Sequence, residues 1–300
     1  MRRLGATLVC ALALCAAAPP AAAAASLDDL PDSVLPGPDA DYGFVVEDLA
    51  TGLRVAYNER RVYPSASVYK LPVAWEVLRS VDQGALSLDE PVPILDEDAV
   101  EPEPVGGVAP GESPSLREAL AAMVSASSNA AAHALLRTLG RHEVNAALAE
   151  NGLRNTRIPE SAPAPGDTDH WAATTAEDIA HLLRTVATAQ GLSQASHEEL
   201  MNMLANGGPP DALRDSLPEG IDILDKTGNL EDASNVGAVL QSPRGTVLLV
   251  VLNRGVDPGE ARAVIAGLGR VAYETFLEVQ ENMSGIPSPV IDEGMPHLLP

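Results

Sequence analysis

Strand signals stand at both ends of this chain, and helix signals fill the middle. The segments YGFVVEDL (42–49) and LRVAYNE (53–59) are rich in β-forming residues and are joined by the turn residues ATG. Strand signals return only in GIDILDK (220–226), NVGAVLQ (235–241) and TVLLVVL (246–252). Because short connections favour antiparallel pairing, we expect an α/β (α+β) fold. Both ends would build one antiparallel sheet flanked by helices, with an all-α subdomain inserted between them.

Helical patterns occupy the middle of the chain and follow the last strand. The first runs from Ser67 to about Val81, and residues 116–139 form two helices separated by the polar break SASSN. A helix over 143–151 ends before the C-cap signal Gly152. Two further helices begin with the capping-box pairs Thr174 with Glu177 and Ser196 with Glu199, and the last covers about 258–280.

The first 25 residues have the features of a secretory signal peptide. MRR gives a positive start, LGATLVCALALC is a short apolar run, and PPAAAAAS offers Ala-x-Ala cleavage sites near Ala25. The apolar run is too short to span a bilayer comfortably, so we expect a secreted or extracytoplasmic protein with no membrane span. A lipoprotein cut at Cys15 is the alternative, although Leu14 is bulky where a small residue is expected.

The expected organisation has three parts. Residues 1–25 are the signal peptide, 27–280 form one catalytic domain, and 281–300 are a flexible tail rich in Pro and Gly. Within the domain, 40–62 plus 215–280 form the α/β part and 63–214 form the all-α part.

Charge and cysteine content exclude several function classes. Acidic residues outnumber basic ones by 42 to 19, so a phosphate backbone would be repelled and we expect no nucleic-acid partner. The only cysteines, Cys10 and Cys15, lie in the segment expected to be removed, which excludes a thiol nucleophile. The histidines show neither H-x-H nor H-E-x-x-H spacing, so we expect no metal and no cofactor. We expect a monomer.

Only two lysines occur in the chain, Lys70 and Lys226, against seventeen arginines. Residues three apart on a helix share a face, so the Lys70 amine can reach the Ser67 hydroxyl. A lysine with a lowered pKa can take a proton from serine, whereas arginine stays protonated. Ser65 points to another face and is interpreted as a helix cap. Alone, this Ser-x-x-Lys spacing is more often an ordinary helix start.

Two more polar clusters have the same ambiguity. Residues 127–129 (Ser-Ser-Asn) occupy a break between helices, where a hydroxyl and an amide could relay a proton and hold a carbonyl. Residues 226–228 (Lys-Thr-Gly) end a strand and offer a positive charge, a hydroxyl and a glycine that a substrate can approach. Taken alone, the first is a Ser/Asn helix cap and the second a strand end before a turn.

Together, the three clusters match the set Ser-x-x-Lys, Ser-Asp-Asn and Lys-Thr-Gly of class A β-lactamases and penicillin-binding proteins. The chain resembles this superfamily from about Tyr42 to Val279. GFVVEDLATGLRVAYNERRVYPSASVYKLPVA resembles its opening hairpin and nucleophile helix, LREALAAMVSASSNAAAHALLRTLG its second-motif hairpin, and LPEGIDILDKTGNLEDASNVGAVL its third-motif strand. The resemblance implies an antiparallel sheet flanked by helices plus an all-α region, with the site between them.

The resemblance implies a catalytic role for four positions. Ser67 is expected to be the acylated nucleophile and Lys70 a general base. Ser127 is expected to pass the proton to the leaving nitrogen, and Asn129 to hold Lys70 and the substrate amide.

It also implies a substrate-binding role for the third motif. Lys226 and Thr227 are expected to bind the substrate carboxylate, with Gly228 beside them. The N–H groups of Ser67 and Asn229 are expected to form the oxyanion hole.

This chain departs from the family pattern at three places. Ser128 stands where the middle motif usually has Asp. Penicillin-binding relatives often carry Ser-x-Asn, so this departure resembles them. Hydrolysing class A enzymes carry in this loop a Glu that activates the deacylating water, followed by an Asn, whereas residues 158–173 contain no Asn and do not show this pattern. Nine residues after the motif lysine, Asn235 replaces a carboxylate-binding Arg, and Arg214 is the suggested substitute.

The shortened loop contains three acids, Glu160, Asp167 and Asp169. Glu160 lies closest to the expected place and is the candidate catalytic base, with a solvated loop charge as the simpler interpretation.

Three functions therefore stay open. The first is an exported serine hydrolase that opens β-lactams through a Ser67 acyl-enzyme, with slow deacylation if no carboxylate is well placed. The second is a penicillin-binding-protein-like carboxypeptidase or esterase that acts on D-Ala-D-Ala or a peptidoglycan-like small substrate. The third is a non-catalytic relative that only binds a ligand or partner.

Overall fold

The computed structural model describes residues 34–37, 41–99, 103–161, 172–207 and 212–277. The expected signal peptide (1–25), with Cys15, and the expected tail (281–300) lie outside the described residues.

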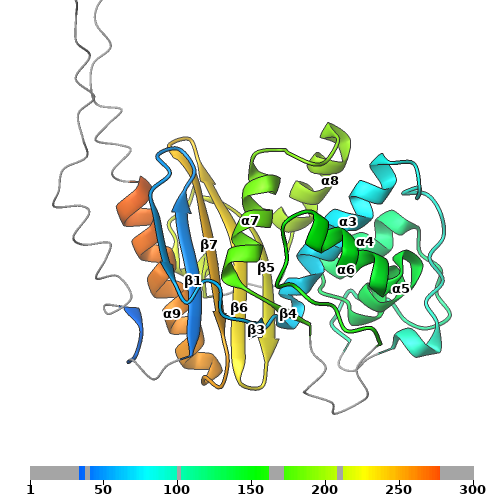
Figure 1. Cartoon of the computed structure of the whole chain (residues 1–300), viewed down its shortest axis with the longest axis horizontal. Helices are drawn as coiled ribbons and strands as arrows, with labels where there is room; N and C mark the ends of the chain where they lie inside the picture. Colours follow the sequence, from blue (N-terminus) through cyan, green and yellow to red (C-terminus); the bar gives the residue numbers. More distant parts are fainter. Residues whose placement is uncertain (1–33, 38–40, 100–102, 162–171, 208–211, 278–300) are drawn as a thin grey trace, which may run out of the picture.

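Five strands form one antiparallel sheet in the order β2-β1-β7-β6-β5 (Figure 1). Two short strands, β3 and β4, pair separately. The strands are β1 (Tyr42–Asp48), β2 (Arg54–Tyr57), β3 (Tyr63–Pro64), β4 (Ala173–Thr174), β5 (Asp222–Leu230), β6 (Ala233–Ser242) and β7 (Gly245–Asn253). Since β1 pairs with β7, the two ends of the described chain build the sheet together, which confirms the expected fold class.

The helices lie on both faces of this sheet. They are α3 (Lys70–Asp82), α4 (Leu116–Val124), α5 (Asn129–Leu139), α6 (Arg141–Glu150), α7 (Ala176–Ala187), α8 (Gln194–Ala205) and α9 (Pro258–Ala272), with 3₁₀ turns η1 (Ala66–Tyr69), η2 (Asp96–Asp98) and η3 (Arg214–Ser216) and a π-helical turn η4 (Tyr273–Leu277). Helix α9 covers one face, and α7 packs on the other against β1, β6 and β7 (Figure 1). Helices α3 to α6 lie beyond α7, away from α9.

The central strand β7 separates two hydrophobic cores. Successive side chains of a strand point to opposite faces, so Leu248 and Val250 enter the core on the α7 side, while Leu249 and Val251 enter the core under α9. This double burial explains why β7 reads as an unbroken apolar run in the sequence.

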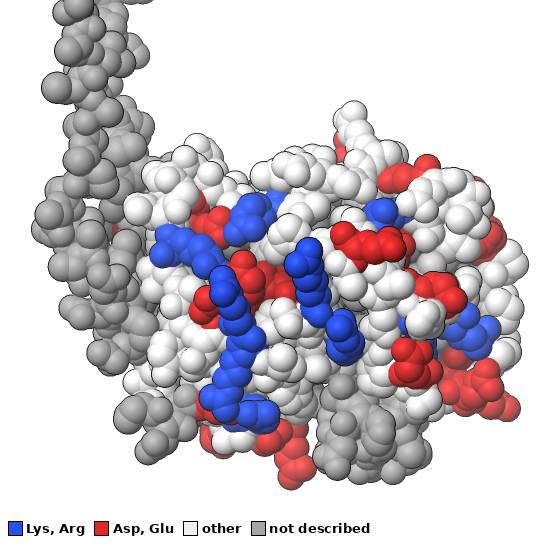
Figure 2. Space-filling view, in the orientation of Figure 1, with Lys and Arg blue, Asp and Glu red and all other residues white. Residues whose placement is uncertain are grey.

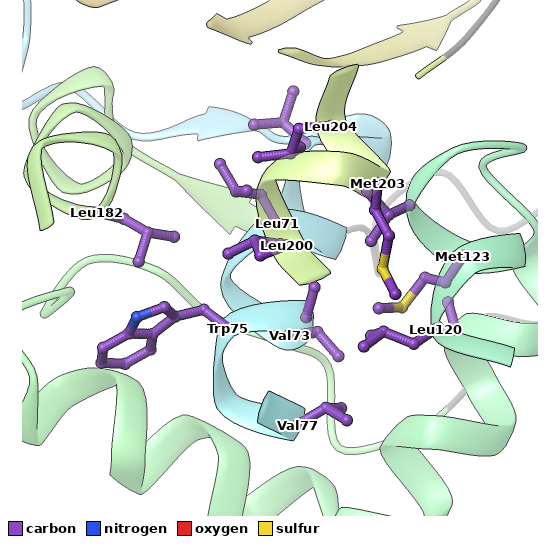
Figure 3. Close-up of a cluster of buried hydrophobic side chains, with 14 of the residues drawn as sticks. Leu71, Val73, Trp75, Val77, Leu120, Met123, Leu182, Leu200, Met203 and Leu204 are labelled. Carbon is purple, nitrogen blue, oxygen red and sulfur yellow. The ribbon is translucent and has the colours of Figure 1, made fainter. Parts of the chain in front are cut away.

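Helix α3 is the centre of the helical part. A helix that is apolar on most of its sides is buried among other elements. Its side chains pack against neighbouring helices (Figure 3), in a cluster that includes Leu71, Val73, Trp75 and Val77 of α3, Leu120 and Met123 of α4, Leu182 of α7, and Leu200, Met203 and Leu204 of α8. The first residue of α3 is Lys70, so this packing holds the lysine in place.

Two predicted helix starts are wrong by one and three residues. The N-cap of α7 is Thr175 rather than Thr174, and its side chain accepts a hydrogen bond from Asp178 N. The N-cap of α8 is Ser193, and Ser196 lies inside the helix with its hydroxyl donating to Asp82 at 2.7 Å. Several Ser and Thr residues cluster at both starts, so spacing alone could not select among them.

The third motif is also placed differently than expected. Strand β5 does not end at Lys226 but continues to Leu230, because β6 pairs with it along its whole length. Residues 226–229 therefore form a rigid stretch of edge strand rather than a turn.

Acidic and basic side chains are interspersed on the face shown in Figure 2. Arg54 bridges Glu47 and Glu177, and Arg184 Nε lies 3.0 Å from Glu47. These pairs connect β1 and β2 with α7. Among the described helices, none is long and apolar enough to cross a membrane.

Candidate active site

A cavity of about 510 Å³ lies between the open edge of the sheet and the helical part. Its lining includes residues from all three motifs, namely Ser67, Ser127, Asn129, Lys226, Thr227, Gly228 and Asn229. Lys70 does not line this cavity but binds two residues that do. The structure therefore brings together the residues expected in one site, apart from Glu160.

Ser67 lies in η1, the 3₁₀ turn that precedes α3. The residue before it, Ala66, has φ +46°, a left-handed conformation that is unfavourable for a side chain. Such strained backbone clusters at functional sites. Ser65 is the N-cap of η1, but it makes no side-chain cap, and its buried hydroxyl donates to Ala172 O at 2.8 Å. The expected capping bond of Ser65 is therefore wrong.

Lys70 is completely buried at the start of α3. Its amine donates to Ser127 O, to Ser127 Oγ at 3.3 Å and to Asn129 Oδ1 at 2.7 Å. Burial, followed by the positive charge of Lys226, lowers the pKa of Lys70 to about 7, and the negative charge of Glu103 acts in the opposite direction. A lysine with this pKa is partly neutral at neutral pH and can accept a proton.

The second motif connects α4 and α5. Ser127 has φ +61°, a second left-handed residue at the site. Ser128 is the N-cap of α5, and its hydroxyl accepts a hydrogen bond from Ala131 N at 3.0 Å. The simpler interpretation as a helix cap is thus correct for Ser128, while Ser127 and Asn129 face the cavity.

The third motif approaches the nucleophile through Gly228. A Cβ on this residue would lie 2.7 Å from Ser67 N and 2.9 Å from Ser65 O. The sequence interpretation assigned this space to a substrate, but the backbone of η1 also requires it. Lys226 is buried beside it and donates to Thr227 O at 2.9 Å.

Neither Asn235 nor Arg214 takes the place of the expected carboxylate-binding arginine. Asn235 lines the cavity, but its amide donates to Pro64 O at 2.8 Å and its carbonyl accepts from Asn253 N at 2.9 Å. Arg214 binds Asp225 and Ile223 O. The suggestion that Arg214 substitutes is not supported, because its guanidinium is engaged with β5 instead.

An arginine that the sequence analysis missed lines the same cavity as Lys226. Arg262 projects from α9, and its side chain is exposed. No local pattern marks this residue, because it reaches the site only when α9 packs on the sheet. Glu103 was missed as well: its carboxylate accepts hydrogen bonds from Asn129 N and Ala130 N, both at 3.0 Å.

Glu160 lies outside the cavity. It is exposed, its nearest recorded partner is Asn145 Nδ2 at 3.5 Å, and it lines a separate hollow with His133 and Arg141. Asp167 and Asp169 lie outside the described residues. The structure thus favours the interpretation of Glu160 as a solvated loop charge.

His133 is a buried residue of α5. Burial and the charge of Arg141 lower its pKa to about 4. Within the described part of the chain, His, Cys, Asp and Glu side chains form no cluster that could hold a metal ion.

Comparisons with known proteins agree with this geometry. A model of the beta-lactamase enzyme family matches residues 29–276. Over 241 residues the chain is 31% identical to beta-lactamase L2 of Stenotrophomonas maltophilia. The matched region covers 77% of this chain and 80% of that protein.

Solved structures show the same fold. The ancestral class A beta-lactamase GNCA superposes with a TM-score of 0.74 and 32% identity, over 85% of this chain and 100% of that one. PBP-A superposes with a TM-score of 0.76 and 22% identity, over 84% of this chain and 96% of that one.

Proposed function

The chain belongs to the beta-lactamase enzyme family and is a serine β-lactam hydrolase, and from this premise we propose that it reacts through a Ser67 acyl-enzyme that is hydrolysed slowly. One observation carries the proposal: the three motifs meet at a single cavity, beside a buried lysine whose pKa lies near neutrality.

The proposed first half-reaction uses Ser67, Lys70 and Ser127. Neutral Lys70 takes the Ser67 proton, and Ser67 Oγ attacks the lactam carbonyl. Ser127, in hydrogen-bond contact with Lys70, delivers a proton to the leaving nitrogen. The N–H groups of Ser67 and Asn229, which both line the cavity, stabilise the oxyanion.

Substrate binding relies on two cations. Lys226 and Arg262 line the same cavity from β5 and α9, where they would attract the carboxylate that β-lactams carry. Thr227 adds a hydroxyl beside Lys226. Arginine suits carboxylates because its planar fork can donate two hydrogen bonds.

The second half-reaction lacks an evident base. Among the described residues that line the cavity, none is Asp or Glu. A general base typically contributes about 10²–10⁴-fold to the rate of its step, so hydrolysis of the acyl-enzyme should be slower by roughly that factor.

Intact-mass spectrometry with penicillin G tests this function. One penicillin mass should appear quickly on the protein and disappear slowly. Absence of both an adduct and an opened β-lactam would overturn the proposal. A protein that opens penicillin with no detectable adduct would refute the slow step alone.

The absence of Asp and Glu among the described residues that line the cavity also favours a second candidate, a carboxypeptidase that acts on peptides ending in D-Ala-D-Ala. Penicillin-binding relatives often carry Ser-x-Asn, as here with Ser128, and a long-lived acyl-enzyme is compatible with this activity. Release of D-alanine from such a peptide, faster than penicillin is opened, would support the second candidate over the first.

We also propose export through residues 1–25. N-terminal sequencing of the protein recovered outside the cytoplasm should find a start near Ser26. A mature chain that begins at Cys15 would indicate the lipoprotein alternative.

A further inference from the structure

The carboxylate of Glu103 holds the second motif from outside it. Oε2 accepts hydrogen bonds from the backbone nitrogens of Asn129 and Ala130, each at 3.0 Å. Oε1 accepts from the hydroxyl of Ser128. Thus Glu103, which precedes the motif by more than twenty residues, contacts two of its three members.

The loop around Glu103 is shaped for this contact. A Cβ on Gly107 would lie 2.0 Å from Glu103 Oε1 and 2.8 Å from its Cδ. Gly107 N also donates to Pro104 O at 3.0 Å, which closes a turn directly after Glu103. Any side chain at position 107 would therefore displace the carboxylate from the motif.

The position of this carboxylate has a physical reason. The first N–H groups of a helix lack partners within the helix and carry a partial positive charge. An Asp at the N-cap commonly satisfies them, but here the N-cap of α5 is Ser128, a neutral residue. Glu103 supplies the missing negative charge from a neighbouring loop.

The same carboxylate acts on Lys70 through space. The charged groups that affect the pKa of the Lys70 amine are Lys226 on β5 and Glu103. The charge of Lys70 in turn contributes to the lowered pKa of His133 on α5. Burial and Lys226 lower the pKa of Lys70, whereas Glu103 raises it. Loss of the Glu103 charge should therefore lower the pKa of Lys70 further.

We propose that Glu103 is a positioning residue of the acylation reaction, which takes the structural place of a motif aspartate at residue 128 by holding Ser128, Asn129 and, through Asn129, Lys70. The inference rests on the proposed function, because it describes how that site is held together.

A charge swap tests the inference. Glu103→Gln keeps the size of the side chain but removes its charge, and the Glu103→Gln/Ser128→Asp double variant returns a carboxylate to the N-cap. Glu112→Gln is the matched control, since Glu112 is an exposed acid of the same loop whose carboxylate binds only Ala109 N in the described structure.

Acylation by penicillin G is the first measurement. Glu103→Gln should acylate about 10–100-fold more slowly, because a small displacement of a reacting group costs up to about that factor. The double variant should recover to within about threefold of wild type, and Glu112→Gln should match wild type. Ser128→Asp alone should be slower than wild type, because it brings two carboxylates together.

Lysine titration is the second measurement and needs no substrate. The chain has only two lysines, so ¹³C-lysine labelling gives two side-chain signals, which Lys226→Arg assigns. The Lys70 titration should move to lower pH in Glu103→Gln and return in the double variant. A merely structural role would not produce this reversal.

Three outcomes would overturn the inference. One is wild-type acylation and an unshifted Lys70 titration in Glu103→Gln. Another is an acylation rate that is low in Glu103→Gln and equally low in the Glu103→Gln/Ser128→Asp double variant, although the double variant has the melting temperature of wild type. The third is an equal loss in Glu112→Gln. If the wild type neither forms a penicillin adduct nor opens penicillin, the proposed function fails, and the lysine titration still decides whether Glu103 acts on Lys70.

Discussion

A Cβ atom on Gly228 would lie 2.7 Å from the backbone nitrogen of Ser67, closer than non-bonded atoms approach. Strand β5 and the nucleophile turn η1 are thus in direct backbone contact. This contact places Lys226, two residues before Gly228 on β5, and Asn229, directly after it, against the same cavity as Ser67. Glycine is required here for space, because the alternative is a shift of the strand or of η1.

Gly228→Ala should therefore impair acylation more than folding. The added methyl pushes Ser67 N away from its place in the proposed oxyanion hole, and loss of one such donor costs about 10²–10³-fold. Stopped-flow acylation by penicillin G measures the effect. Gly37→Ala is the control, since a Cβ there meets nothing within 4 Å. Wild-type acylation of Gly228→Ala would show that the contact is dispensable.

Ser67→Ala should abolish the penicillin adduct, while Ser65→Ala should retain it. The Ser65 hydroxyl donates to Ala172 O, which also accepts from Ser65 N at 2.8 Å, so its loss leaves that carbonyl satisfied. The cost to the free energy of unfolding should be about 1 kcal/mol, the usual net value of one hydrogen bond. Intact mass and thermal melting check both variants. An adduct that survives Ser67→Ala contradicts the assignment of the nucleophile.

The positions of the main strands and of the three motifs could be predicted from the sequence because each has a local pattern. The apolar run of β7 and the spacing of Ser67 and Lys70 depend only on neighbouring residues. Glu103 and Arg262 could not be predicted in this way. Glu103 reaches the second motif from a loop and Arg262 reaches the cavity from α9, and only tertiary packing determines which side chains these segments present there.

Acylation should depend on the protonation of Lys70. The pKa of Lys70 is about 7, so the neutral amine is lost as pH falls below that value, and the acylation rate should fall with it. Between about pH 8 and 9 the rate should level off. Because Lys226 lowers this pKa, Lys226→Ala should move the limb to higher pH. A rate that does not change between pH 5 and 9 would show that Lys70 is not the base.

Lys226 and Arg262 should discriminate between anionic and neutral substrates. Removing either cation weakens the attraction for a substrate carboxylate, so Lys226→Ala and Arg262→Ala should each lower acylation by penicillin G by about 10-fold or more, as expected for a charged hydrogen bond of about 1.5–3 kcal/mol. A neutral ester should lose less. Arg270→Ala, an exposed residue of α9 that does not line this cavity, is the control. Equal losses on both substrates would indicate a role in chemistry or folding.

Glu160→Gln should leave both phases of penicillin turnover unchanged. The expected record for wild type is a burst of one equivalent of opened β-lactam followed by a slow steady rate. Lys70 is the proposed base of acylation, whereas none of the described residues that line the cavity is an Asp or Glu that could activate the deacylating water. Glu160 is exposed and lines a different hollow, so its charge should not affect either phase. If the slow rate falls in Glu160→Gln while the burst stays, Glu160 reaches the acyl-enzyme after all. If the wild type instead turns over rapidly without a burst, a group other than the described residues that line the cavity activates the water. Asp167→Asn and Asp169→Asn then test the two loop acids, because loss of the true base should slow deacylation and make a burst visible.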